Sequence, residues 1–358
     1  MLYHLLYPLA DQVPLFNVFR YITFRAAGAI VTALLLSLFL GPWFIRTLRR
    51  LSVGQNIREV GPQAHQVKAG TPTMGGLLIL FAVLVPTLLW ANLDNLYVWV
   101  AVAVTTAFGA IGFADDYLKV RRRNNLGLSV RGKFFLQVLV AAALGAYLLW
   151  LPGFDATVYF PFFKRLVWQA GVFYVPFVAL VLAGTSNAVN LTDGLDGLAI
   201  GATLVASATY AVFTYIAGNR IISNYLQVTY VPGAGEVTVF CGALVGASLG
   251  FLWFNSHPAE VFMGDVGSLS IGAAIGSVAV LAKQELVLVL VGGLFVMEAL
   301  SVIIQVVSFK LTGRRVFRMS PLHHHFELSG WAEPKVIVRF WILSILFALL
   351  SLSTLKLR

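Results

Sequence analysis

Long apolar runs, separated by short polar stretches, follow one another along most of the chain. Several of them hold about 17 or more uncharged residues, enough for a helix to cross a hydrocarbon core roughly 30 Å thick. Strands of a β-barrel would alternate apolar and polar residues instead. The pattern therefore predicts an all-α polytopic membrane protein with about ten transmembrane helices, at Ala26–Trp43, Met74–Trp90, Val98–Ala114, Phe134–Leu151, Trp168–Ala183, Leu198–Ile216, Val237–Phe254, Leu269–Leu281, Leu286–Phe309 and Val336–Leu352.

The composition agrees with a membrane location and excludes a soluble globular domain. Of the 358 residues, 59% are hydrophobic and 11% are charged, and the mean hydropathy is +0.85. The polar loops are too short for a separate soluble domain, so residues 1–358 are interpreted as one membrane domain. Two longer connections, about Pro152–Val167 and Ala217–Glu236, contain Gly, Pro and aromatic residues, which suit an interfacial helix or a small hairpin.

The first cation of the chain is Arg20, so the N-terminus lacks the charged region of a cleavable signal peptide, and the first apolar segment is expected to stay as a span. The single cysteine, Cys241, rules out an intramolecular disulfide framework. The net charge of +10 would suggest nucleic-acid binding in a soluble protein, but in a membrane protein the positions of the cations decide its meaning. No nucleic-acid partner is expected.

The distribution of the cations predicts the orientation of the helices. With both termini outside, 17 of the 25 lysine and arginine residues fall on the inner side and 8 on the outer side. Because cytoplasmic loops carry the excess of Lys and Arg, both termini are expected to be periplasmic. The same orientation places five widely separated acids at the cytoplasmic face, which indicates one site there: Asp115, Asp116, Asp193, Asp196 and Asp265.

Asp115 and Asp116 follow the apolar run that ends at Ala114. A carboxylate near the bilayer centre costs roughly 2.5–3.5 kcal/mol on insertion scales, so the pair is expected at the membrane surface. Neighbouring helical residues point about 100° apart, which favours two different roles, and Lys119 one turn later offers a counter-ion to Asp115. A solvated helix end beside the basic run Lys119–Arg123 explains this pair equally well.

Hard oxygen donors alternate with glycines in the segment Asn187–Gly197, which contains Asn190, Asp193 and Asp196. Glycine lets the backbone approach a ligand closely. The alternative is a turn rich in Asn, Asp and Gly by propensity alone. The density of side-chain oxygens in so apolar a chain favours a loop that binds a cation or a polar ligand.

The segment Asn255–Ser268 places Asp265 between two glycines, just before the next span. Magnesium prefers octahedral oxygen coordination by one or two carboxylates with phosphate and water, whereas calcium sites need more protein oxygens. Asp265 is therefore the predicted ligand of Mg2+. Phe262 in the same segment either stacks on a base or anchors the membrane interface, and the two interpretations are equally supported.

Three consecutive histidines, His323–His325, lie in the predicted inner loop Lys310–Leu328. Histidines can donate to phosphate or act as acid and base near neutral pH. A zinc site is disfavoured because adjacent residues rarely converge on one ion and no cysteine supports them. Glu298 lies deep in the ninth apolar run with no cation within a helical turn, and a structural polar contact is the preferred interpretation there.

A glycine-rich polar segment, Gly61–Gly76, precedes the second span and lacks the P-loop pattern. It contains Lys68, and a second lysine, Lys133, begins the fourth span. A point charge on a flexible stem suits an anionic phosphate oxygen, so both lysines are candidate phosphate ligands. Either one suits anionic lipid head groups as well.

Taken together, the motifs resemble the polyprenyl-phosphate N-acetylhexosamine-1-phosphate transferase superfamily, and within it the phospho-N-acetylmuramoyl-pentapeptide transferases of bacterial peptidoglycan synthesis. The resemblance extends from Phe16 to Arg358. It rests on TPTMGG at Thr71–Gly76, the pair Asp115 and Asp116, NAVNLTDGLDGLA at Asn187–Ala199, FMGDVGSL at Phe262–Leu269 and PLHHHFEL at Pro321–Leu328. The aspartate pair alone would be weak evidence, but the ordered set is specific.

The resemblance implies a multi-pass protein of the bacterial cell inner membrane, with outer termini and a cytoplasmic active site. It implies transfer of phospho-N-acetylmuramoyl-pentapeptide from UDP-N-acetylmuramoyl-pentapeptide to undecaprenyl phosphate, dependence on Mg2+, contact with membrane lipid, and a homodimer. The catalytic residues it implies are Asp115, Asp116, Asp265 and His324, with Asp265 as the metal ligand. The substrate-binding residues are Lys68, Thr73, Lys133, Asn190, Asp193, Asp196, Asn255, Phe262, Gln305 and His325.

A lipid phosphate is already an anionic nucleophile, so charge repulsion and alignment form the main barrier and direct in-line attack is the preferred mechanism. A covalent phosphosugar on an aspartate is the alternative. A transporter or lipid flippase is the rival class, but such proteins place ionisable groups near the bilayer midplane. Here the motif acids gather at one surface. A related transferase for another sugar is the closer rival.

Overall fold

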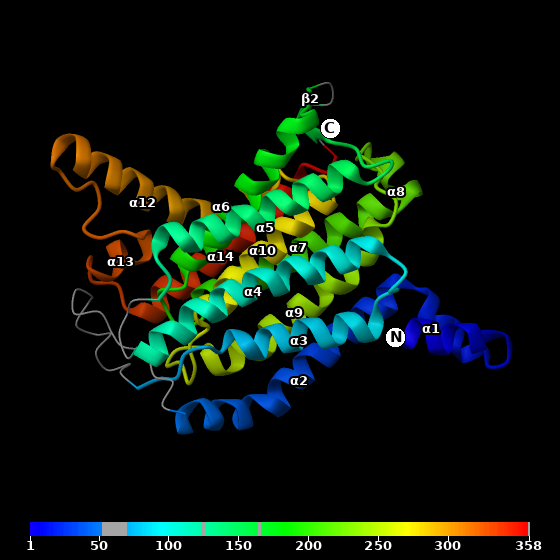
Figure 1. Cartoon of the computed structure of the whole chain (residues 1–358), viewed down its shortest axis with the longest axis horizontal. Helices are drawn as coiled ribbons and strands as arrows, with labels where there is room; N and C mark the ends of the chain where they lie inside the picture. The colour runs from blue at the N-terminus through cyan, green and yellow to red at the C-terminus, as the bar shows by residue number, and fades with distance from the viewer. Residues whose placement is uncertain (52–69, 123–126, 164–165, 357–358) are drawn as a thin grey trace.

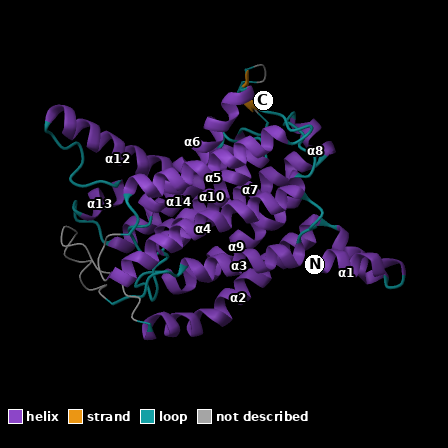
Figure 2. Ribbon diagram, viewed as in Figure 1, coloured by secondary structure: helices purple, strands orange, loops and turns teal. Residues whose placement is uncertain are grey.

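The computed structural model describes residues 1–51, 70–122, 127–163 and 166–356 (Figure 1). Within these residues the chain is almost entirely helical, as Figure 2 shows. The long helices are α2 (Ile22–Arg50), α3 (Gly76–Trp90), α4 (Leu96–Arg122), α5 (Val130–Trp150), α6 (Tyr174–Thr192), α7 (Leu198–Gly218), α9 (Val237–Asn255), α10 (Gly264–Leu281), α12 (Gly293–Thr312) and α14 (Glu333–Ser353).

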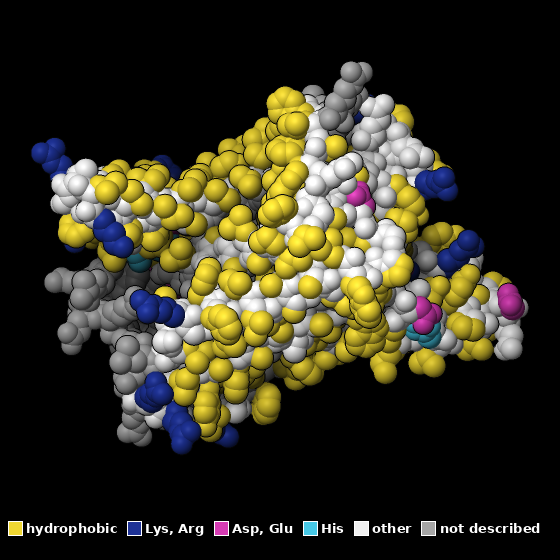
Figure 3. Space-filling model, turned by 45° about the horizontal axis from the view of Figure 1, so that its top comes forward, with side chains coloured by type: hydrophobic (Ala, Val, Ile, Leu, Met, Phe, Trp, Pro, Cys, Tyr) yellow, Lys and Arg dark blue, Asp and Glu magenta, His cyan; other side chains and the backbone are white. Residues whose placement is uncertain are grey.

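Nine helices in the described part of the chain are long and apolar enough to cross a membrane, and α3 is a shorter apolar helix of the same kind. Each of these ten helices overlaps one of the ten predicted runs, which confirms a polytopic membrane fold. The space-filling view shows the corresponding apolar surface (Figure 3). Side chains of Lys and Arg gather at its ends, with several at the end where α4 finishes and α12 protrudes.

Helix α10 lies at the centre of the bundle (Figure 1), where it packs against α3, α4, α6 and α7. Sixteen of its eighteen residues are buried. Small residues allow this packing, because a Cβ at Gly272 would meet the backbone of Ser186 on α6, and a Cβ at Gly76 would collide with the backbone of Gly267. Close backbone approach through small residues is how membrane helices pack where water provides no driving force. The packing fixes the start of α10, where Asp265 lies.

The two longer connections, at the end of the bundle away from the start of α10, contain the small hairpin and the short helix that were expected there. A two-stranded antiparallel hairpin joins β1 (Thr157–Tyr159) to β2 (Val167–Gln169). The short helix α8 (Arg220–Leu226) follows α7. The N-terminal segment forms α1 (Leu2–Leu6) and the 3-10 helices Tyr7–Asp11 and Pro14–Arg20, followed later by the 3-10 turns Gly171–Phe173 and Ala234–Glu236.

Several predicted boundaries were wrong. Helix α2 continues to Arg50 and α4 continues to Arg122, past the predicted ends at Trp43 and Ala114. The run Leu286–Phe309 is not one helix: α11 (Leu288–Val291) ends at Val291, and α12 starts at Gly293 after the intervening Gly292. The hydropathy pattern does not register this break because both sides are apolar. Helix α10 begins at Gly264 instead of Leu269, so Asp265 lies in its first turn. Trp168 belongs to strand β2, and the next span begins at Tyr174.

Candidate active site

Two acids on the last turns of α4 are buried and held in place by backbone N–H groups. Asp115 and Asp116 are each 3% exposed. The N–H of Leu128 donates to Asp115 Oδ1 at 2.8 Å, and the N–H of Val266 donates to Asp116 Oδ2 at 3.1 Å. One oxygen of each carboxylate is therefore fixed by a neighbouring segment. The remaining oxygens face Lys119, whose Nζ lies 2.6 Å from Asp115 Oδ2 and 3.4 Å from Asp116 Oδ1.

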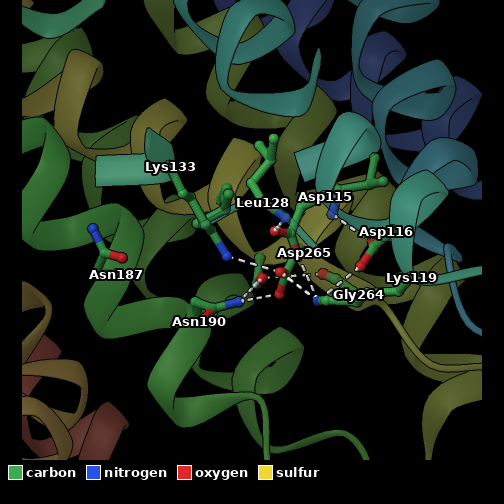
Figure 4. A network of polar contacts seen from close by, with 12 residues as sticks. Asp115, Asp116, Lys119, Leu128, Lys133, Asn187, Asn190, Gly264 and Asp265 are labelled. Atoms are coloured by element: carbon green, nitrogen blue, oxygen red, sulfur yellow. Dashed lines mark hydrogen bonds and ion pairs between the residues drawn. The ribbon is translucent and has the colours of Figure 1, made fainter. Parts of the chain in front are cut away.

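Asp265, from the first turn of α10, completes a three-carboxylate cluster with this pair (Figure 4). Candidate ligand oxygens of the three residues lie within 4.8 Å of one another. Lys119 Nζ and Lys133 Nζ each lie 2.7 Å from Asp265 Oδ2. On the other side, Asn190 Nδ2 donates to Asp265 Oδ1 at 2.7 Å. Four helices, α4, α5, α6 and α10, thus contribute side chains to one cluster.

The predicted motif Thr71–Gly76, which leads into α3, pairs through its backbone with Phe262, in the segment that leads to Asp265. The N–H of Gly75 donates to Phe262 O and the N–H of Phe262 donates to Pro72 O, both at 2.8 Å. Gly264 has φ of +71°, a left-handed conformation that glycine adopts without penalty. A Cβ at this position would lie 2.6 Å from Asp116 Oδ2 and 3.0 Å from Thr73 Oγ1. Only glycine therefore fits between Thr73 and the aspartate cluster.

Asp193 follows the end of α6, three residues after Asn190. Burial, together with the negative charges of Asp265, Asp116 and Asp196, raises the pKa of Asp193 to about 8. The raised pKa favours the protonated form of this carboxyl group at neutral pH. A neutral acid can donate a hydrogen bond beside the ionised cluster, which an ionised one cannot.

Asp196 lies in a second group of ionisable side chains. Its Oδ2 accepts from the N–H of Ala259 at 3.1 Å and lies 3.2 Å from His257 Nδ1. His257 Nδ1 is also 3.6 Å from Glu333 Oε2, and Glu333 Oε1 accepts from the N–H of Asp196 at 3.1 Å. These contacts connect the α6–α7 and α9–α10 connections to the start of α14.

Two predicted substrate ligands use their amides within the protein. Asn255 is buried; its Oδ1 accepts from the N–H of Gly197 at 3.1 Å and its Nδ2 donates to Val261 O at 2.8 Å. Gln305 Oε1 accepts from the N–H groups of Val316 and Phe317 at 2.9 Å each, and its Nε2 donates to Phe317 O. Asn255 thus holds the segment that leads to Asp265, and Gln305 holds the segment that follows α12.

The histidines form the short helix α13 (Leu322–Glu327). His323 is fully buried, and His324 Nδ1 lies 2.7 Å from Glu327 Oε2. His325 Nδ1 accepts from the N–H of Arg318 at 3.2 Å. Lys68 lies outside the described residues.

The donor set fits a magnesium ion. Carboxylate oxygens are the ligands that Mg2+ prefers, and three carboxylates exceed the charge of the two lysines beside them. The position of Lys119 shows that the cluster binds positive charge. Its ammonium group lies where oxygens of all three acids converge. Asp115, Asp116 and Asp265 are the residues that would hold the ion.

Sequence reasoning missed several members of the site. It offered Lys119 as a counter-ion of Asp115, which is confirmed, but not as a partner of Asp265 146 residues away. The spacing of Asp115 and Lys119 on one helix face was the available signal. Ser268, whose Oγ accepts from Asn190 Nδ2 at 2.7 Å, gave no signal beyond its place in the glycine-rich segment. Asn187 lies apart from the cluster and donates to Gln137 at 2.6 Å (Figure 4).

Comparison with known proteins agrees with this geometry. Residues 98–283 match the family model described as glycosyl transferase family 4, and residues 68–80 match signature 1 of phospho-N-acetylmuramoyl-pentapeptide-transferase. Proteins with that name from Geobacter sp. (strain M21) and Pelobacter propionicus are each 60% identical to the chain over 358 residues, covering 100% of both sequences. A third, from Desulfosudis oleivorans, is 60% identical over 359 residues.

The membrane bundle with its buried aspartate cluster is thus a membrane transferase of the glycosyl transferase family 4 class. Within this class, the chain belongs to the phospho-N-acetylmuramoyl-pentapeptide-transferase family. It is a multi-pass membrane protein of bacteria.

Proposed function

We propose that the aspartate cluster transfers phospho-N-acetylmuramoyl-pentapeptide from UDP-N-acetylmuramoyl-pentapeptide to undecaprenyl phosphate. The products are undecaprenyl-pyrophosphoryl-N-acetylmuramoyl-pentapeptide, called lipid I, and UMP. The full-length similarity to transferases with this name supports the choice of substrates. The carrying observation is the convergence of three carboxylates and two lysines from three helices, α4, α5 and α10, at one end of the bundle.

Asp265 is the proposed magnesium ligand, with Asp115 and Asp116 beside it. When bound, Mg2+ neutralises charge on the pyrophosphate and on the departing UMP. The protein contributes fixed carboxylates, because Leu128 and Val266 each hold one oxygen through a backbone N–H. Such preorganisation avoids the cost of rearranging ligands when the substrate binds.

Lys119 and Lys133 bring the two anionic substrates together. Both ammonium groups now share Asp265 Oδ2, and both sit on the last or first turns of helices facing the same cluster. Phosphate oxygens compete for such ammonium groups as further acceptors. Undecaprenyl phosphate is already anionic, so it attacks in line without prior removal of a proton. His324 is then available to donate to a phosphate oxygen.

The remaining predicted substrate ligands have three proposed roles: contact with the substrate, orientation of Asp265, and support of the surrounding loops. Lys68, Thr73, Asp193, Phe262 and His325 are proposed to contact the nucleotide or pyrophosphate, and Asn190 is proposed to orient Asp265 through its amide. Asp196, Asn255 and Gln305 are proposed to act indirectly. Their side chains are committed to the loops that surround the site, which supports a role in shaping it.

The site is proposed to face the cytoplasm, with both termini periplasmic. The excess of Lys and Arg at the ends of α2, α4 and α12 supports this orientation through the positive-inside rule. A homodimer is kept as an expectation from the family resemblance.

The decisive experiment measures UMP release by the detergent-purified protein with both substrates. Release is expected to require undecaprenyl phosphate and magnesium, to stop with EDTA, and to fall by roughly 10²-fold or more in Asp265→Asn. Turnover of UDP-N-acetylglucosamine in place of the muramoyl substrate would show that the sugar assignment is wrong. Isolation of a phosphosugar attached to an aspartate would replace direct attack with the two-step route.

A further inference from the structure

Glu298, the acid buried deep in α12, is not part of the aspartate cluster. It is fully buried. Its Oε2 accepts from the N–H of Leu322 at 2.6 Å, and its Oε1 accepts from the N–H of His323 at 3.2 Å. A buried carboxylate persists in a membrane protein only with such partners. The expected structural polar contact is therefore present, and it falls on the histidine segment.

The contact has the form of a helix cap supplied from another helix. Leu322 and His323 open α13, and the first N–H groups of a helix have no partner within it. Pro321, which precedes them, provides no side-chain cap. The carboxylate of Glu298 takes over this function, and negative charge is favoured at a helix N-terminus. With six residues, α13 has too few internal bonds to hold its own position.

His323 connects the same contact to the loop that follows α6. Its Nδ1 lies 3.2 Å from Glu298 Oε1, and both side chains are fully buried. On its other side the imidazole fills the space above Gly194, where any Cβ would collide with Nε2. Gly194 directly follows Asp193. His323 is thus packed between α12 and the loop that carries Asp193.

The two following histidines depend on this arrangement. The ring of His324 meets that of His323 edge-on, with centroids 4.2 Å apart. His325 follows on the same short helix, where its Nδ1 accepts from the N–H of Arg318. A shift of His323 would therefore be transmitted to both.

From these contacts we infer that Glu298 is a positioning residue, which sets the orientation of His324 and His325 by capping α13 and seating His323 against Gly194. The inference rests on the proposed transferase function for the catalytic role of His324. The carboxylate of Glu298 is fully buried and contacts Leu322 and His323. It acts on the reaction through the histidines, and it is held by α12, which starts at Gly293.

The test combines Glu298→Ala with His324→Ala in a double-mutant cycle of UMP release. Misplacement by about 1 Å can cost roughly 100-fold in rate, so Glu298→Ala is expected to lower kcat by about 10- to 100-fold. In the His324→Ala background the same change is expected to cost at most about twofold, because residues that act through one another are not additive. Glu298→Gln keeps one acceptor oxygen and is expected to lose less.

The matched control is Glu285→Gln, which alters another buried acid. Glu285 lies at the opposite end of the bundle, where its Oε1 accepts from Tyr174 Oη at 2.6 Å and from Lys283 Nζ at 3.1 Å. This change is expected to lower the melting temperature and to leave kcat unchanged. An equal loss of kcat from Glu298→Ala in both His324 backgrounds would reduce Glu298 to a general stability role and overturn the inference.

Hydrogen exchange without substrate separates this inference from the proposed function. Glu298→Ala is expected to speed exchange in a peptide covering residues 322–328, while Glu285→Gln is not. If the parent protein releases no UMP, the proposed reaction fails and exchange alone decides the anchoring of α13. Unchanged exchange in Glu298→Ala would contradict the anchoring, whatever the activity.

Discussion

Asp265 shares one carboxylate oxygen between two ammonium groups, those of Lys119 and Lys133, each at 2.7 Å. Lys119 has two further acidic neighbours, Asp115 and Asp116, whereas Lys133 forms its ion pair with Asp265. The two lysines therefore differ: Lys119 belongs to the carboxylate cluster, and Lys133 is the more readily transferred to a phosphate oxygen.

Lys133→Gln is expected to lower kcat/KM by roughly 10²- to 10³-fold, because it removes a cation that stabilises the phosphate charge in the transition state. Steady-state UMP release measures the loss. The matched control is Lys356→Gln, at the opposite end of the bundle, where Nζ lies 3.9 Å from the centre of the Tyr225 ring. Equal activity of both variants would exclude Lys133 from phosphate binding.

Asp193 gives a prediction on pH. Its folded-state pKa of about 8 lies above the ordinary value of 3.8, so the folded protein holds a proton that the unfolded chain releases across that interval. The contribution of this group to stability is thus fully present below pH 4 and is lost as pH rises towards 8. In EDTA, the Tm of Asp193→Asn is expected to fall less between pH 5 and 8 than that of the parent. Parallel Tm curves would show that Asp193 has an ordinary pKa.

At the scale of elements, the connection before α10 combines a left-handed glycine with close packing. Gly264→Ala is expected to abolish UMP release and lower Tm, because its Cβ would lie 2.6 Å from Asp116 Oδ2. Gly313→Ala separates the two causes: Gly313 has a φ of +70° at the end of α12, but nothing lies within 4 Å of the added Cβ. That variant should lose only roughly 1 kcal/mol of stability. Similar activity losses in both would assign the effect to backbone strain.

The helices could be predicted because each span must be apolar over its own length, which is a local property of the sequence. The break at Gly292 could not, since it lies between Val291 and Gly293 in an unbroken apolar run. The acids of the site were found as exceptions in apolar surroundings. The partners of these acids could not be predicted. The backbone N–H of Leu128, which donates to Asp115, leaves no trace in a pattern of side chains. In the same way, the contact between Glu298 and His323 joins residues that are 25 positions apart in the sequence. Contacts between helices depend on packing, which one sequence does not display.

For the whole molecule, the distribution of Lys and Arg between the two ends of the bundle predicts its orientation in the membrane. Cys241 is the only cysteine in the chain and is buried, so single introduced cysteines can report each end without background. Asp94 lies between α3 and α4 with an 83% exposed side chain, and Arg314 is exposed beyond α12. The two positions mark opposite ends of the bundle.

With a membrane-impermeant maleimide, Asp94→Cys is expected to be labelled in cells whose outer membrane alone is permeabilised. Arg314→Cys should be labelled only after the inner membrane is opened as well. The expectation follows because the end with α12 carries Lys310, Arg314 and Arg315, and such clusters are retained in the cytoplasm. The reverse pattern would place the aspartate cluster in the periplasm, away from UDP-linked substrates, and the proposed reaction would have no donor there. The labelling experiment thus tests the orientation of the bundle, on which the proposed reaction depends.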